Sequence, residues 1–127
     1  MTASPSKRHE YIRWAEKNER YIIEDDFESE FSLTPKNVET LFSHSSKDNV
    51  IYMNTFSKTI SSSFRIGYMV LPEKLLEEFN KKLGFYSCTV PVFEQYVLTE
   101  LMNNGDFERH INRVRRARRK ANKNLVI

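Results

Sequence analysis

Residues 50–59 decide the fold: they read Val-Ile-Tyr-Met-Asn-Thr-Phe-Ser-Lys-Thr, an apolar run that ends in hydroxyl residues around Lys58. A short apolar run bounded by turn-forming residues is typical of a buried strand. A second apolar run, residues 21–23, ends in the acidic residues 24–26. In an open α/β sheet, ligands bind beyond the carboxyl ends of the strands. We therefore predict a ligand site where these two runs end.

The rest of the chain predicts helices around a few strands. Apolar residues spaced three or four apart predict helices at 7–18, from Thr34-Pro35 onward, 72–84, 91–104 and from Asp106 onward. Strands are predicted at 20–24, 50–54 and 65–71. This alternation favours an α/β fold with a few-stranded, mainly parallel sheet and flanking helices. Three strands leave long unpaired edges, so we expect the chain to be part of a larger domain.

Composition excludes several classes of protein. The 127 residues are 39% apolar and 29% charged, as in a soluble globular protein, and no apolar run approaches the roughly eighteen residues of a membrane span. The first ten residues lack the apolar stretch of a secretory signal. Cys88 is the single cysteine, which fits a reducing compartment. We expect a cytoplasmic protein without a membrane contact. His9, His44 and His110 are scattered, so no metal site is expected.

The net charge of +3 conceals a local basic cluster, in which six of the eight residues from Arg113 to Lys120 are basic. Clustered cations can neutralise nucleic-acid phosphates. The same pattern is found on the solvated face of a helix, and no aromatic residues for base stacking are interleaved here. A small basic nucleic-acid-binding protein acting through Arg113–Lys120 is therefore the alternative interpretation.

The residues at the two strand ends have the chemistry that pyridoxal 5′-phosphate needs. A lysine amine forms the covalent bond to this cofactor, and a carboxylate keeps its pyridine nitrogen protonated. Arginine and hydroxyl groups bind its phosphate. Residues of these types in plausible places are Lys58, Asp25, Thr55, Ser57 and Arg65. The spacing alone leaves a second interpretation open for two of them. Lys58 can be a solvated loop lysine, and Asp25 can belong to a solvated acidic turn.

Two motifs carry a family resemblance. Ser57-Lys58-Thr59, followed by Arg65-Ile66-Gly67-Tyr68, resembles the lysine signature of class I/II aminotransferases of fold type I, which depend on pyridoxal phosphate. Residues 22–31, Ile-Ile-Glu-Asp-Asp-Phe-Glu-Ser-Glu-Phe, resemble the aspartate signature of the MocR-type regulators. In those regulators an aminotransferase-like domain follows a winged helix-turn-helix domain of the GntR type.

The resemblance assigns roles to single residues. It implies that Lys58 is the catalytic Schiff-base lysine and that Asp25 is the partner of the pyridine nitrogen. Thr55, Ser57 and Arg65 would bind the phosphate. Where the pattern has a tyrosine that hydrogen-bonds the ring oxygen of the cofactor, this chain has Phe27, whose phenyl ring cannot make that bond.

The resemblance also divides the chain. It implies a partial fold type I large domain that runs into helices of the small domain. Residues 1–84 would form the C-terminal half of the cofactor-binding large domain, and residues 85–127 the interdomain and small-domain helices. Nothing in the sequence matches the winged helix, the linker or the other half of the large domain, so we expect a central fragment.

By the same likeness, the intact parent would transfer amino groups, or sense an amino acid or amine through imine exchange at Lys58. It would do so as the effector domain of a DNA-binding regulator. We expect the parent to be a homodimer that contacts DNA only through the winged-helix domain. We do not expect this chain to transaminate alone.

Overall fold

The computed structural model of the chain describes residues 4–26, 39–45, 48–57, 59–61 and 63–123. The elements are, in chain order, α1 (Pro5–Lys17), β1 (Ile22–Asp25), α2 (Leu41–His44), β2 (Val50–Thr55), β3 (Gly67–Val70), α3 (Glu73–Leu83), α4 (Val92–Asn103) and α5 (Asp106–Lys123). They belong to two compact units. The first draws its described residues from 4–26, 39–54 and 68–87, and the second draws them from 55–67 and 88–123.

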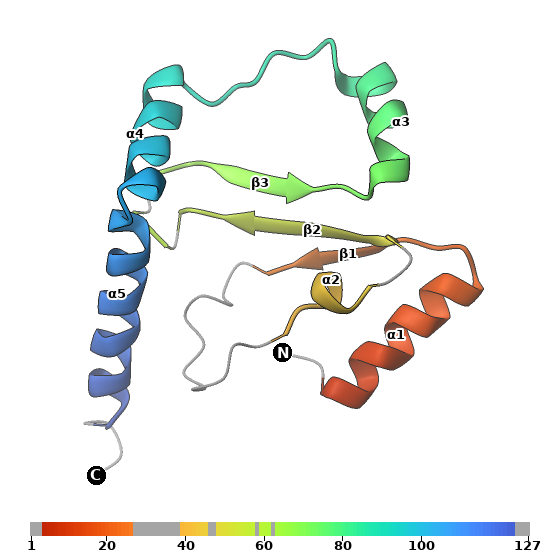
Figure 1. The fold of residues 1–127 in the computed structure, drawn as a ribbon, viewed down its shortest axis with the longest axis horizontal. Helices are drawn as coiled ribbons and strands as arrows, with labels where there is room; N and C mark the ends of the chain where they lie inside the picture. The colour runs from red at the N-terminus through yellow and green to blue at the C-terminus, as the bar shows by residue number, and fades with distance from the viewer. Residues whose placement is uncertain (1–3, 27–38, 46–47, 58, 62, 124–127) are drawn as a thin grey trace. The chain divides into compact units, whose positions relative to one another are not determined.

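The three strands form one sheet in the order β1-β2-β3. β1 and β2 pair in parallel, with Ile22 opposite Val50 and Asp25 opposite Met53, which confirms that the two strands predicted to carry the site are neighbours. The β3 arrow in Figure 1 runs opposite to β2, so the sheet is mixed. A parallel partner needs a crossover connection, usually a helix. Because no helix separates β2 from β3 in the described residues, β3 returns antiparallel to its neighbour.

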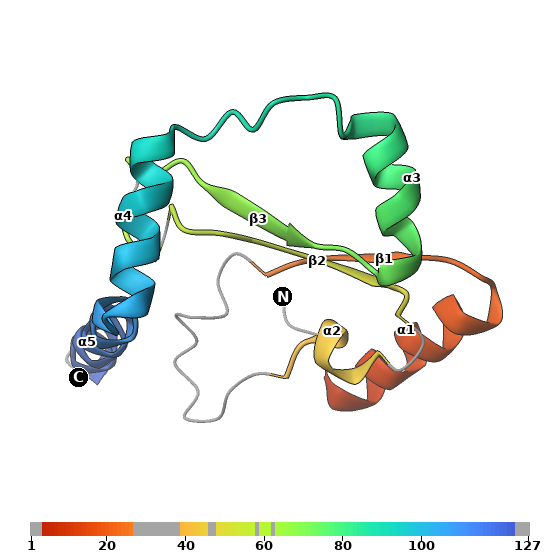
Figure 2. The same ribbon diagram turned by 45° about the horizontal axis from the view of Figure 1, so that its top comes forward.

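Helix α2 covers one face of the sheet in the first unit. The Glu24 carboxylate accepts hydrogen bonds from the backbone N–H groups of Leu41 (2.8 Å) and Phe42 (2.9 Å), the first residues of α2. Side chains alternate across a strand, so Ile23 and Asp25 point to the opposite face. Both are exposed. α1 lies beside α2, as Figure 2 shows.

Each unit has a small apolar core. In the first unit Ile12 and Ala15, one helical turn apart on α1, are buried together with Val50 of β2. In the second unit the buried apolar residues are Phe56, Ile66 and Ile111. α1 therefore packs through one stripe of its surface, as its apolar periodicity predicts.

The helix predicted from Thr34-Pro35 onward does not run unbroken through residues 39–40. Thr34 and Pro35 lie outside the described residues, but residues 39–40 are not helical and α2 starts only at Leu41. The Thr40 side chain caps it by accepting a hydrogen bond from the Ser43 N–H at 3.0 Å. A threonine cap in an extended conformation satisfies a free N–H of the first turn. Thr40 therefore sets the start of α2.

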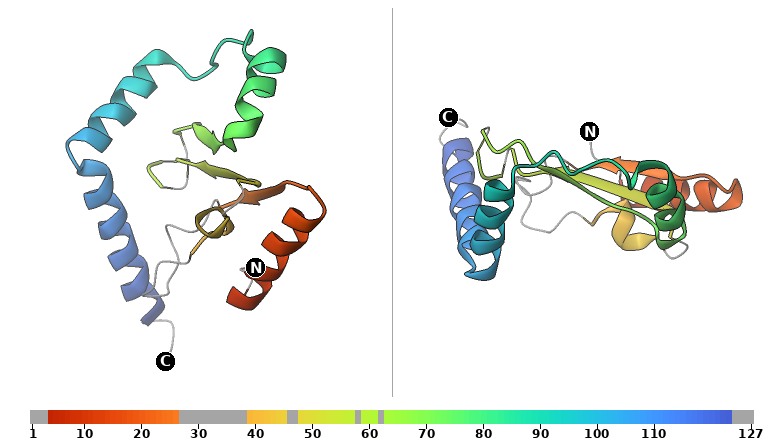
Figure 3. Two further views of the ribbon diagram at one scale, coloured as in Figure 1. Left: turned by 45° about the vertical axis from the view of Figure 1, so that its right-hand side comes forward. Right: turned by 90° about the horizontal axis from the view of Figure 1, so that it is seen from above.

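In the second unit, α4 and α5 follow each other with a bend at Gly105, which is visible in both panels of Figure 3. Gly105 has a φ of 75°, a left-handed conformation that costs glycine little and other residues more. Glycine at this point lets the chain leave α4 and start α5 at once. The Asn104 side chain caps α5 by accepting a hydrogen bond from the Asp106 N–H at 2.9 Å.

Candidate functional site

The end of β1 carries two carboxylates in different surroundings. The Asp25 side chain is exposed, and its carboxylate has no hydrogen-bond or ion-pair partner among the described residues. Asp26, the next residue, accepts a hydrogen bond from the Tyr52 hydroxyl at 2.8 Å. The Asn54 amide donates to the same hydroxyl oxygen at 3.0 Å. Asp26 is therefore held by β2, while Asp25 remains available to a ligand.

The Tyr52 hydroxyl holds its proton more firmly than an ordinary tyrosine. Burial is the main cause that raises its pKa. The hydrogen bond from Asn54 is the next largest influence and lowers the pKa, while the hydrogen bond to Asp26 and the negative charge of Asp26 raise it further. Removing the proton would leave a phenolate beside a carboxylate. Tyr52 therefore remains a hydrogen-bond donor to Asp26 at neutral and moderately alkaline pH.

The loop after β2 is closed by its own hydroxyl groups. Ser57 Oγ donates to the carbonyl of Phe64 at 2.8 Å, and Thr55 Oγ1 donates to the carbonyl of Ile66 at 3.1 Å. The Phe56 N–H also donates to Ile66, at 2.8 Å. These bonds anchor the residues on both sides of Arg65. The structure thus brings together Thr55, Ser57 and Arg65, the three residues predicted to bind phosphate.

Helix α5 packs against this loop. His110 Nε2 lies 2.8 Å from the carbonyl oxygen of Thr59, and since a carbonyl only accepts, Nε2 carries the hydrogen. The rings of Phe56 and Phe107 meet edge to face, with centroids 5.8 Å apart. Phe107 and His110 are three residues apart, so they share one face of the helix. The contact of His110 with Thr59 was not predicted from the sequence. Helical spacing indicates which face of a helix is packed, but it does not indicate which segment packs against that face.

Two of the predicted site residues, Lys58 and Phe27, lie outside the described residues. Asp25 belongs to the first unit, whereas Thr55, Ser57 and Arg65 belong to the second. The roles assigned to all six residues therefore stay predictions. The sequence reasoning also missed Tyr52 and Asn54, although their spacing of two residues in a strand places them on one face.

The described residues fit the functional groups of pyridoxal phosphate. A phosphate accepts hydrogen bonds, and Arg65 is exposed without a partner among the described residues. Ser57 and Thr55 donate to backbone carbonyls, so each hydroxyl would have to turn to reach a phosphate oxygen. Such an exchange of one hydrogen bond for another is nearly balanced in energy. The unpartnered Asp25 carboxylate can in turn accept a hydrogen bond from a protonated ring nitrogen.

The basic cluster lies within α5. At 100° per residue, its six basic positions fall within about 220° of the helix circumference, and the remaining sector of about 140° carries Val114, Ala117 and Ala121. Binding of nucleic acid through Arg113–Lys120 stays a prediction.

In the part of the chain that the structure describes, no three residues among His, Cys, Asp and Glu are grouped so that they could hold a metal ion. None of the described helices combines the length and the apolar character that crossing a membrane requires.

The aminotransferase class I and II family matches residues 2–126. The chain belongs to this family. Among its relatives are helix-turn-helix regulators: it is 40% identical over 115 residues to the transcriptional regulator YdeL of Bacillus subtilis, covering 91% of this chain and 25% of YdeL. It is 30% identical over 105 residues to the probable rhizopine catabolism regulatory protein MocR of Rhizobium meliloti, covering 83% of this chain and 21% of MocR. The chain thus spans about a quarter of the length of these relatives.

Solved aminotransferases share the fold. The kynurenine aminotransferase of Pyrococcus horikoshii, solved in complex with PMP, superimposes with a TM-score of 0.81 at 27% identity, covering 91% of this chain and 29% of that enzyme. LysN of Thermus thermophilus, an α-aminoadipate aminotransferase complexed with a phosphopyridoxyl-leucine, gives a TM-score of 0.73 at 27% identity, covering 89% of this chain and 30% of LysN. The α/β fold is therefore part of a fold type I aminotransferase domain.

Proposed function

We propose that this chain is the lysine-bearing part of a domain that binds pyridoxal 5′-phosphate. In this proposal Lys58 holds the cofactor covalently and Asp25 accepts a hydrogen bond from its pyridine nitrogen. Thr55, Ser57 and Arg65 bind its phosphate. The observation that carries the proposal is the closed loop of the second unit, because two side-chain hydrogen bonds fix the residues on either side of Arg65.

The chain's own residues have distinct tasks. When bound, pyridoxal phosphate supplies an aldehyde that exchanges with amines and a ring that accepts electrons. The Asp25 carboxylate keeps a proton on the ring nitrogen, and Arg65 neutralises phosphate charge with a planar pair of donors. Phe27 can pack against a ring but offers no hydrogen bond to it. The ring oxygen therefore lacks the donor that a tyrosine would provide.

We further propose that the whole protein is a MocR-type regulator, since relatives of both kinds, regulators and aminotransferases, match this segment. Its ligand is an amino acid or an amine, which it either transaminates or senses. DNA contact comes from a winged-helix domain outside these 127 residues, and the regulator acts in the cytoplasm. Exposed apolar residues on α4, Val92 (66%), Phe93 (77%) and Tyr96 (69%), support association as a homodimer.

The cofactor proposal is tested by titrating pyridoxal 5′-phosphate into the full translated polypeptide that contains this chain. We expect a saturable visible absorption band that Lys58→Ala abolishes and that Lys81→Ala leaves intact. Lys81 is the matched control because it is an exposed lysine whose ion pair with Glu77 lies on the surface. A band that survives in Lys58→Ala, or no band at all, contradicts the proposal.

A second measurement separates an enzyme from a sensor. The loaded polypeptide is incubated with a panel of amino acids and amines, and the release of keto acid or aldehyde is measured over many equivalents. Turnover supports transamination. A spectral change that stops at one equivalent, together with altered DNA binding, supports sensing.

A further inference from the structure

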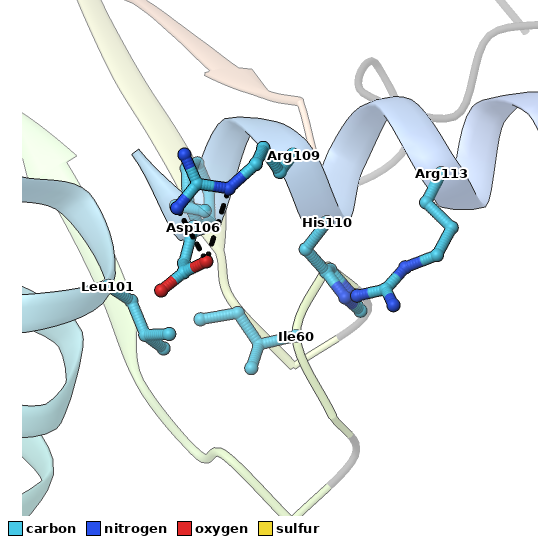
Figure 4. Close-up of a pocket in the computed structure, with 7 residues that line it drawn as sticks. Ile60, Leu101, Asp106, Arg109, His110 and Arg113 are labelled. Atoms are coloured by element: carbon cyan, nitrogen blue, oxygen red, sulfur yellow. Dashed lines mark hydrogen bonds and ion pairs between the residues drawn. The ribbon is translucent and has the colours of Figure 1, made fainter. Parts of the chain in front are cut away.

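The second unit contains a cavity of about 490 Å³ beside the loop that follows Lys58. Its lining comes from that loop, from the end of α4 and from the first two turns of α5, as Figure 4 shows. The apolar residues are Ile60, Leu101 and Phe107, and the polar ones are Asp106, Arg109, His110 and Arg113. This volume is within the range of small-molecule sites.

Most of the polar lining is already engaged. Arg109 donates to the Asp106 carboxylate, with Nη2 and Oδ1 2.8 Å apart, so the two charges cancel. Arg109 also donates to the carbonyl of Asn104 at 3.1 Å. His110 Nε2 is occupied by the carbonyl of Thr59. These groups shape the cavity and leave little capacity for a ligand.

Arg113 is the exception. It lines the cavity, and no hydrogen bond or ion pair joins it to any residue that the structure describes. In Figure 4 its side chain extends toward the end of the cavity where His110 lies. Positions 106, 110 and 113 follow one another at intervals of four and three residues, so they share the face of α5 that borders the cavity. Among the described residues, the cavity thus has one uncompensated positive charge.

We infer that this cavity binds a small monocarboxylate with an apolar body, such as an aromatic acid. The carboxylate accepts two hydrogen bonds from the Arg113 guanidinium, in the bidentate geometry that arginine provides. The apolar body lies against Ile60, Leu101 and Phe107 and is removed from water there. A dianion would exceed the available charge, and a neutral molecule would leave Arg113 unpaired.

The site has a direct structural link to the cofactor loop. Ile60 belongs to the cavity and is two positions after Lys58. His110 lines the cavity and holds the carbonyl of Thr59, the residue that follows Lys58. A ligand that moves either residue therefore alters the backbone next to the lysine. Occupancy of the cavity would adjust the position of that loop.

Benzoate is the probe, and the binding is followed by NMR of the Ile60 and Leu101 methyl groups in the full translated polypeptide that contains this chain. We expect saturable shifts of these methyl signals. Benzamide, with the same ring and no charge, binds at least about tenfold more weakly, since its neutral amide makes weaker hydrogen bonds to Arg113 than a carboxylate does. Arg113→Gln weakens benzoate binding by a similar factor. Arg119→Gln, an exposed residue of the same helix outside the cavity, leaves it unchanged.

Three results would overturn the inference. They are the absence of saturable shifts, equal affinity for benzoate and benzamide, and equal affinity of the wild type and Arg113→Gln. Inorganic phosphate that displaces benzoate at equal concentration would also overturn it, because the apolar body would then contribute nothing. Benzoate has no aldehyde and cannot modify Lys58, so this test and the cofactor test fail independently.

Discussion

The ends of β1 and β2 carry the two halves of the predicted site, and the structure holds them by different means. At the end of β1, the neighbouring β2 fixes Asp26 through Tyr52, while the Asp25 carboxylate has no partner in the part of the chain that the structure describes. At the end of β2, the loop fixes itself, because Ser57 and Thr55 donate to carbonyls of the same loop. One end therefore depends on contact between strands, and the other depends on local bonds. In both places the residues next to the predicted ligand-binding residue make the hydrogen bonds that hold the chain. Asp25 and Arg65 are therefore not needed for those bonds.

The strongest test of this comparison is to replace Asp25 and Asp26 by alanine, one at a time. We expect Asp25→Ala to lower pyridoxal phosphate affinity at least about tenfold, the loss of one charged hydrogen bond, with little change in stability. Asp26→Ala leaves the Tyr52 hydroxyl without its acceptor and lowers the free energy of unfolding by about 1–3 kcal/mol. Cofactor titration and urea denaturation of both variants measure this crossed pattern. Equal effects of the two variants would remove the distinction.

Much of this could be predicted from the sequence, and the reasons are local. The run 50–54 is apolar and the acidic and hydroxyl residues follow directly, so both strands and their order along the chain were predictable. The parallel pairing of β1 and β2 follows from an intervening helix. The roles of Tyr52 and His110 were not predictable, because each depends on a partner distant in sequence, Asp26 and Thr59. The start of α2 at Leu41 was not predicted either, because it depends on the Thr40 cap.

Glu24 tests how strongly contact between elements holds the end of β1. Glu24→Ala removes the acceptor of two backbone N–H groups at the start of α2, and we expect a loss of about 1–2 kcal/mol in the free energy of unfolding. Glu77→Ala is the matched control, since its exposed pair with Lys81 contributes at most about 0.5 kcal/mol. Equal losses in the two variants would show that Glu24 does not cap α2.

Tyr52 makes the free energy of unfolding depend on pH in the alkaline range. Its pKa is raised in the folded chain, so the unfolded chain loses this proton first, near the ordinary value of about 10. The contribution of Tyr52 to the free energy of unfolding is therefore fully present below pH 10 and falls as the pH rises above that value. Tyr52→Phe should cost about 1 kcal/mol at pH 7 and reduce the alkaline slope. Urea denaturation between pH 8 and about 11 measures both, and an unchanged slope would contradict the assignment.

Ser57 tests the self-closed loop with the smallest expected change. Ser57→Ala removes the hydrogen bond to the Phe64 carbonyl, at a cost of about 0.5–1.5 kcal/mol. We expect faster amide hydrogen exchange at Phe64 and Ile66, with no change in β1. Ser63→Ala in the same loop is the control, because Ser63 is exposed. Faster exchange in β1 would mean that the two strand ends are not independently held.

The central claim is that the loop after β2 presents Lys58 to pyridoxal phosphate. The most direct measurement is borohydride reduction of the full translated polypeptide after loading with the cofactor, followed by peptide mapping by mass spectrometry. We predict one reduced adduct, on the peptide that contains Lys58. An adduct spread over several lysines, or on a peptide without Lys58, would contradict the account.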